Sequence, residues 1–143
     1  MQRRFSPGAK HQQVQCSVRL LLDTVTFIWA VDSPERISRK AMAALKHNET
    51  VREMSAISLS EIAIKGALGK LNLSIEDVLL GIADLRMRIL PYTADHAGRL
   101  FGLPLHHADP FDRQIIAQAL SENIPVVTSD EKFRLYKGIK IVW

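Results

Sequence analysis

Residues 106–119 read HHADPFDRQIIAQA. Pro110 is typical of the first position of a helix, where its missing N–H is no loss, and Asp109 stands where a capping residue is expected. Asp112 then lies in the first turn, and the positions three, four and seven residues after it are apolar: Ile115, Ile116 and Ala119. We therefore predict that Asp112 lies at the head of a buried helix face. A carboxylate in that place needs a partner, because burying an unpaired charge is costly.

The composition is that of one globular domain. The chain has 143 residues, of which 47% are hydrophobic and 24% are charged, enough for a single core. No apolar run approaches the roughly 20 residues of a membrane helix. The only cysteine, Cys16, excludes an intramolecular disulfide, and there is no paired-cysteine zinc motif. A cytoplasmic location is the default expectation.

The net charge of +4 is confined to the start of the chain. Residues 1–19 contain four basic residues and no acid, so the remainder is balanced and the high pI is poor support for nucleic-acid binding. Residues 1–17 are polar and basic, without the apolar core of a secretory signal. We expect a flexible basic leader there and a single domain over residues 18–143.

Short apolar runs alternate with helical patterns after the leader. We predict strands at 18–22, 54–57, 88–90, 125–128 and 139–142. We predict helices at 25–31, 33–47, 58–69, 75–85, 93–100 and from 110 onward. This alternation predicts an α/β fold with a largely parallel sheet covered on both faces.

Four acids fall where the carboxyl ends of the strands are expected to meet. Asp23 and Asp130 follow the first and fourth strands, and Glu61 begins the helix after the second. Asp112 begins the helix that returns to the fourth strand, so it can reach the same edge, where parallel sheets bind their ligands. Crowded carboxylates are stable when a cation neutralises them, and oxygen ligands favour Mg²⁺ or Mn²⁺ over zinc. One or two such ions suit phosphodiester hydrolysis.

Most of these acids also have an ordinary structural interpretation. Ser58 and Glu61 match a capping box, and Glu61 is spaced to pair with Lys65 on the same helix. Asp130 can cap the segment that follows it. Capping explains Asp23 poorly, because a strand-end acid in an apolar context gains little from it. The joint placement of the acids at one edge favours a shared site.

The neighbouring polar and aromatic residues give weaker signals. His106 and His107 flank the acids, but a histidine pair in a polar loop is more often a bystander than a ligand or a base. Lys65 and Arg113 are candidates to contact RNA phosphates, and Trp29 is a weaker candidate for base stacking. Solvated or core positions are equally good interpretations of all three.

Four motifs in order carry a family resemblance. They are LLDT at 21–24, SLSEIAIK at 58–65, LPLHHADPFDR at 103–113 and VTSDEKF at 127–133. Together they resemble the PIN-domain family, and within it the VapC-like toxins of bacterial type II toxin–antitoxin pairs. The resemblance covers about residues 18–143 and implies a three-layer α/β/α domain with a central five-stranded, mainly parallel sheet.

The resemblance also implies a function and a site. The implied activity is an Mg²⁺- or Mn²⁺-dependent ribonuclease that forms a homodimer and is inhibited by a small antitoxin protein entering its active groove. The acidic residues of the family correspond here to Asp23, Glu61, Asp112 and Asp130. Thr128 corresponds to a hydroxyl that supports the last acid, and Asp109 is expected to cap the helix or to assist through water.

Two other classes of function stay open at this point. A phosphatase or phospho-acceptor domain also uses a strand-end aspartate, but the phosphatase pattern needs a second acid where this chain has Val25. A non-catalytic PIN-like module that binds RNA or a protein would keep the fold, although the presence of all four acids gives little reason to prefer it.

Overall fold

A computed structural model describes residues 18–143, and the predicted leader at 1–17 lies outside the described residues. The sheet has the strand order β3-β2-β1-β4-β5, with every pair of neighbours parallel. Its strands are β1 (Val18–Leu22), β2 (Thr50–Ser55), β3 (Arg88–Leu90), β4 (Val126–Val127) and β5 (Ile141–Val142). The predicted α/β class and the five-stranded parallel sheet are confirmed.

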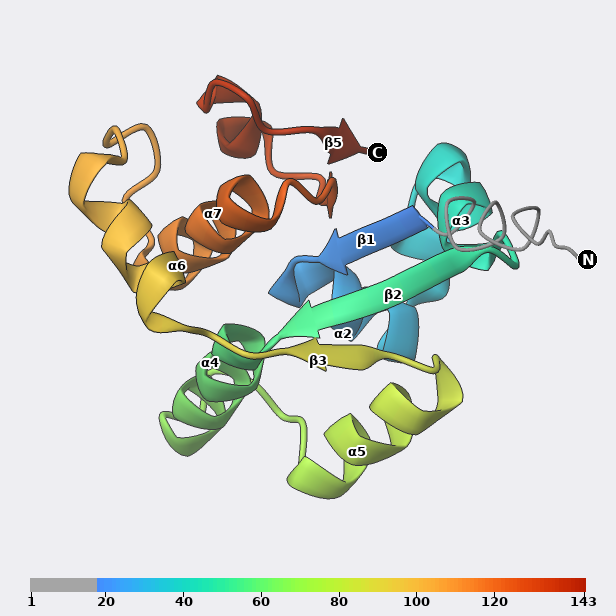
Figure 1. The fold of residues 1–143 in the computed structure, drawn as a ribbon. Coiled ribbons are helices and arrows are strands. Elements are labelled where there is room, and N and C mark those ends of the chain that lie inside the picture. The colour runs from blue at the N-terminus through green and yellow to red at the C-terminus, as the bar shows by residue number, and fades with distance from the viewer. Residues whose placement is uncertain (1–17) are drawn as a thin grey trace, which may run out of the picture.

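Helices cover both faces of the sheet. They are α2 (Thr24–Asp32), α3 (Arg39–Lys46), α4 (Ala56–Ala67), α5 (Ile75–Asp84), α6 (Ala94–Gly98) and α7 (Pro110–Glu122). Short 3-10 turns follow at η2 (Pro34–Arg36), η3 (Arg99–Gly102) and η4 (Glu131–Leu135). Figure 1 shows α7 with α6 on one side of the sheet and α2 with α3 on the other.

The alternation of side chains along β1 supplies both cores. Leu20 and Leu22 pack with Phe27 of α2 on one face, whereas Leu21 packs with Ile115 of α7 on the other. This is the period of two that a strand buried on both faces requires. The three layers place the start of α2 and the start of α7 at the carboxyl edge of the sheet.

The second strand and the helix after it differ from the prediction. β2 ends at Ser55, whose hydroxyl accepts a hydrogen bond from the Ile57 amide and caps α4. The predicted capping box at Ser58 and Glu61 is therefore wrong, because Ser58 is already inside the helix. Its Oγ lies 2.7 Å from Thr24 Oγ1 and ties α4 to α2.

The predicted helix at 33–47 is two elements. Pro34 starts only the turn η2, Ile37 is extended, and Ser38 caps α3 by accepting from the Ala41 amide. Two start signals lie four residues apart, and the second one begins the longer helix. Across residues 18–143, no helix combines the length and the apolar character that crossing a membrane requires.

Candidate active site

Asp23 lies between the end of β1 and the start of α2 and is buried. Its Oδ1 accepts from the Thr26 amide at 2.9 Å, and its Oδ2 accepts from Thr128 Oγ1 at 2.6 Å. Asp23 is thus the N-cap of α2, and the expectation that capping explains it poorly is wrong. Burial raises the pKa of Asp23; the hydrogen bonds from Thr128 and Thr26 oppose this rise, and the charge of Asp130 adds to it.

Thr128 joins two of the acids. Besides donating to Asp23, its Oγ1 accepts from the Asp130 amide at 3.0 Å. The sequence predicts that this hydroxyl supports Asp130. In the structure it binds the backbone amide of Asp130, and the carboxylate that it binds is that of Asp23. A single buried hydroxyl fixes the spacing of the β1 and β4 ends.

The start of α7 is built as the sequence predicts. Asp109 caps the helix, because its Oδ1 accepts from the amides of Phe111 at 2.8 Å and Asp112 at 3.0 Å. Pro110 occupies the first helical position. The Asp112 side chain is 21% exposed and lies at the head of the buried face.

Asp112 shows that the acids converge. Burial and the negative charges of its neighbours raise the pKa of Asp112 to about 8. The neighbouring charges belong to Asp109, Asp23, Glu61 and Asp130. Carboxylates from four distant segments therefore lie within electrostatic reach of one another, as the sequence predicts, and together they hold more negative charge than the site can stabilise by itself.

Glu61 projects from α4 and is 5% exposed. Its Oε2 accepts from Lys65 Nζ at 2.5 Å, the pairing that the spacing predicts. Its Oε1 is buried and has no hydrogen-bond partner among residues 18–143. A buried carboxylate oxygen without a donor is unfavourable, so this atom is a ready ligand for a cation.

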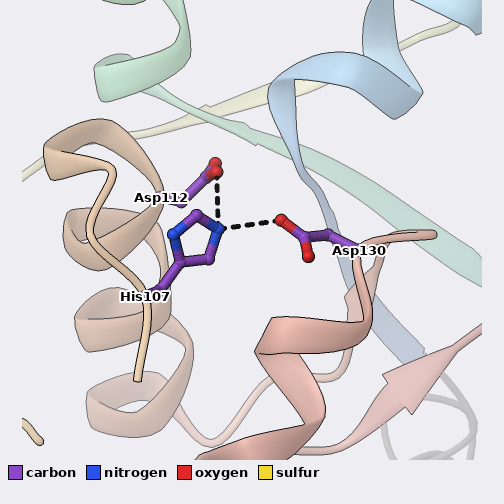
Figure 2. A group of neighbouring side chains, drawn as sticks. All are labelled: His107, Asp112 and Asp130. Carbon is purple, nitrogen blue, oxygen red and sulfur yellow. Dashed lines mark hydrogen bonds and ion pairs between the residues drawn. The ribbon is translucent and has the colours of Figure 1, made fainter. Parts of the chain in front are cut away.

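Asp130 and His107 complete the site (Figure 2). Asp130 Oδ1 accepts from the Lys132 amide at 2.9 Å and caps η4, while Oδ2 is 2.8 Å from His107 Nε2. The same His107 Nε2 lies 3.1 Å from Asp112 Oδ2. His107 is buried and contacts two of the acids, which its position in a polar loop did not predict. His106 is exposed, and its ring contacts Tyr136 edge-on with centroids 5.0 Å apart.

The three candidates for RNA contact already make contacts within the fold. Arg113 donates to backbone carbonyls of the preceding loop and so braces the start of α7: those of Leu103, Pro104 and His107. Trp29 is half-buried between Trp143 and the Arg36 guanidinium. Lys65 pairs with Glu61. Their contact with RNA stays a prediction.

The candidate ligand atoms of the site fit a hard divalent cation. Carboxylate oxygens dominate the site, and one atom each of His107, Asp112 and Asp130 lies within 4.8 Å of the other two. The unpaired Oε1 of Glu61 and the raised pKa of Asp112 are both signs of uncompensated negative charge. A cation bound among these groups would remove both.

A three-layer parallel α/β domain with acids from four segments gathered at the carboxyl edge of its sheet defines a class of candidate metal-dependent enzymes. The model of one family with this architecture, the PIN domain, matches residues 20–139. The protein belongs to the PIN-domain family.

Solved structures share this fold. A chain of VapBC2 from Rickettsia felis, bound to a DNA fragment from their promoter, is 18% identical with a TM-score of 0.65; the match covers 87% of this chain and 97% of that one. A chain of VapBC-1 from nontypeable Haemophilus influenzae is 21% identical with a TM-score of 0.60, and covers 87% and 96% respectively. A search of curated proteins found no match.

Proposed function

We propose that this protein is a metal-dependent endoribonuclease that hydrolyses RNA phosphodiester bonds as the toxin of a toxin–antitoxin pair. The observation that carries the proposal is the buried Oε1 of Glu61, which has no hydrogen-bond partner among residues 18–143; the raised pKa of Asp112 nearby supports it. A divalent cation bound between these carboxylates would neutralise their repulsion and could also bind a phosphodiester.

Four carboxylates are proposed to hold one or two Mg²⁺ or Mn²⁺ ions directly or through water: those of Asp23, Glu61, Asp112 and Asp130. When bound, such an ion activates a water molecule and stabilises the leaving oxygen of the phosphodiester. The chain itself supplies rigid placement, because Thr128 fixes Asp23 and Asp109 fixes the first turn of α7. Lys65 leaves one oxygen of Glu61 free by binding the other.

The proposed partners are a small antitoxin protein and a second copy of this chain. The similar structures from Rickettsia felis and Haemophilus influenzae are VapBC structures, which supports an antitoxin partner for a chain of the same fold. Co-purification with the product of the neighbouring reading frame, followed by light scattering of the complex and of the chain alone, tests both partners. A chain that stays monomeric and binds no such product would contradict them.

Cleavage of RNA tests the activity. We expect the purified chain to cut total RNA with Mg²⁺ or Mn²⁺ and to stop when the ion is chelated. Asp112→Asn and Asp23→Ala should each reduce cleavage more than about 100-fold, since even loss of an outer-shell contact to a metal ligand costs 10- to 100-fold. Asp95→Asn, which changes an exposed acid on α6, is the matched control.

The alternative, a non-catalytic module, predicts a different result. Such a module binds RNA or a protein without cutting RNA and needs no ion. Calorimetry in which Mn²⁺ gives no heat, together with RNA left intact, would overturn the nuclease proposal. Cleavage that persists in chelator or in Asp112→Asn would instead move the active site elsewhere.

A further inference from the structure

His107 is the one nitrogen donor among the candidate ligands, and its surroundings define what it can do. It lies in the loop before α7 and is 7% exposed. Its backbone amide donates to the Tyr136 hydroxyl at 2.8 Å, and its ring packs edge-on against Phe133 with centroids 5.8 Å apart. The backbone of His107 is thus held by one contact and its ring by the other.

The two ring nitrogens of His107 face opposite kinds of partner. Nδ1 accepts from the Asp109 backbone amide at 3.2 Å. A backbone amide can only donate, so Nδ1 must carry the lone pair and the ring proton must be on Nε2. Nε2 in turn faces Asp130 Oδ2, which can accept its proton, at 2.8 Å, and lies 3.1 Å from Asp112 Oδ2.

We infer that His107 is a positioning residue that donates from Nε2 to the carboxylate of Asp130, with the carboxylate of Asp112 close beside it, and that it is not a ligand of the metal. This inference rests on the proposed metal site and deepens it. The ring lies between the start of α7 and the loop after β4, so one N–H holds Asp130 beside a ring that also contacts Asp112 (Figure 2).

Ligation by His107 would require a different arrangement. A metal at Nε2 needs the lone pair there, which moves the proton to Nδ1, opposite the Asp109 amide. The N–H at Nδ1 and the backbone N–H of Asp109 would then face each other at the start of α7. The Asp109 amide would lose its hydrogen-bond acceptor. The capped helix therefore keeps the imidazole in the tautomer with its proton on Nε2. A histidine that donates to a metal ligand in this way lies outside the metal's own coordination shell.

This arrangement also determines which ions the site accepts. Without a bound nitrogen, the ligands are carboxylate oxygens and water, which suit Mg²⁺ as well as Mn²⁺. With His107 as a ligand, the site would favour a transition metal such as Mn²⁺ or Zn²⁺ over Mg²⁺. The role of one histidine thus separates two kinds of metal centre on the same backbone.

Electron spin-echo spectroscopy of the full chain loaded with Mn²⁺ alone tests the assignment. A histidine ligand adds a strong ¹⁴N modulation from the bound imidazole, and we expect none in the wild-type protein. Long-range ¹H–¹⁵N correlation of the metal-free protein should place the ring proton of His107 on Nε2. Both measurements use the unaltered chain, so they do not depend on whether a variant folds.

Substitutions at His107 give a second test of the inference. His107→Ala should weaken Mn²⁺ binding about 10- to 100-fold, the usual effect of losing an outer-shell donor. His107→Gln restores an N–H near the position of Nε2 but cannot ligate through it, so it should retain most of the affinity. His106→Ala, the exposed neighbour, is the matched control and should bind Mn²⁺ like the wild type.

The outcomes separate this inference from the proposed function. A ¹⁴N modulation in the wild type, or a His107→Gln variant as weak as His107→Ala, would overturn the positioning role while leaving a metal centre in place. Wild-type protein that binds no Mn²⁺ would overturn the proposed function, and the positioning role with it. Absence of the modulation with rescue by glutamine would establish the role of His107 as a donor.

Discussion

Replacing Asp112 by asparagine should make the metal-free protein more stable. The pKa of Asp112 rises from 3.8 to about 8 on folding because of burial and the nearby acids. At pH 7 the folded chain therefore keeps a proton on Asp112 that the unfolded chain releases. At 1.36 kcal/mol for each pH unit above 3.8, this lowers the free energy of unfolding by about 4 kcal/mol. Asparagine takes up no proton, and its poorly paired amide costs about 1–2 kcal/mol, so we expect a net gain of about 2–3 kcal/mol.

The pH dependence of the free energy of unfolding tests the sign of the Asp112 contribution. Between about pH 4 and about pH 8 the folded state binds more protons at Asp112 than the unfolded state does, so the contribution of this group to stability falls as the pH rises. The stability difference between Asp112→Asn and the wild type should therefore widen across this window, by up to about 1.4 kcal/mol per pH unit. The rise in the pKa of Asp23 comes chiefly from burial and acts in the same direction in both proteins.

Urea unfolding in chelator, followed by far-UV circular dichroism at several pH values, measures this difference. Asp95→Asn, which removes an exposed acid, should leave the pH profile of the wild type unchanged. An Asp112→Asn variant that is no more stable than the wild type at neutral pH would refute the reasoning. A stability difference that stays constant with pH would also refute it, because the gain would then come from packing rather than from charge.

Three further substitutions test the supports of the site. Thr128→Val removes the 2.6 Å donor to the buried Asp23 and should lower the free energy of unfolding by about 1–3 kcal/mol in urea titrations; unchanged stability would contradict this. Lys65→Met leaves Glu61 buried without its cation, so the melting temperature should fall in chelator and recover with Mn²⁺, and a loss that Mn²⁺ does not reverse would contradict the proposed site. Arg113→Lys should destabilise the protein by about 2 kcal/mol, since an ammonium group cannot reach several carbonyls as the guanidinium does; a melting curve like that of the wild type would argue against the brace.

Local signals in the sequence predict the start of α7 correctly. The cap at Asp109, the proline after it and the apolar positions below Asp112 act within one or two turns, so they need no knowledge of the rest of the chain. Ile115 and Ile116 are fully buried as the pattern predicts. The convergence of the acids was also predictable, because parallel strands bring their carboxyl ends to one edge.

The parts that the sequence did not predict depend on distant partners. β2 begins four residues earlier than predicted, because Arg52 and Glu53 read as polar. In the structure Glu53 is 2% exposed and binds the guanidinium of Arg19 on β1, which also reaches Glu122 of α7. Charged residues can occupy a buried strand when their partners are 34 and 103 positions away, and no local pattern indicates such pairs.

The contacts of His107 were missed for the same reason. Its partner Asp130 is 23 residues away, and only the fold brings the two together. A local signal did exist, since a histidine two residues before an N-cap can accept the amide of that cap, as His107 does from Asp109. That contact fixes the ring but does not by itself reveal what the other nitrogen faces.

Capping and metal binding are compatible roles for these acids rather than alternatives. Asp23 and Asp130 each use one oxygen to cap the segment that follows and the other to accept from a side chain of the site. The caps fix where the carboxylates point before any cation arrives. Asp112 differs, because its own amide is capped by Asp109 and no backbone group within residues 18–143 donates to its carboxylate, which lies 3.1 Å from His107 Nε2. Burial and the neighbouring acids oppose the ionisation of Asp112, so a cation bound beside it would favour the ionised form.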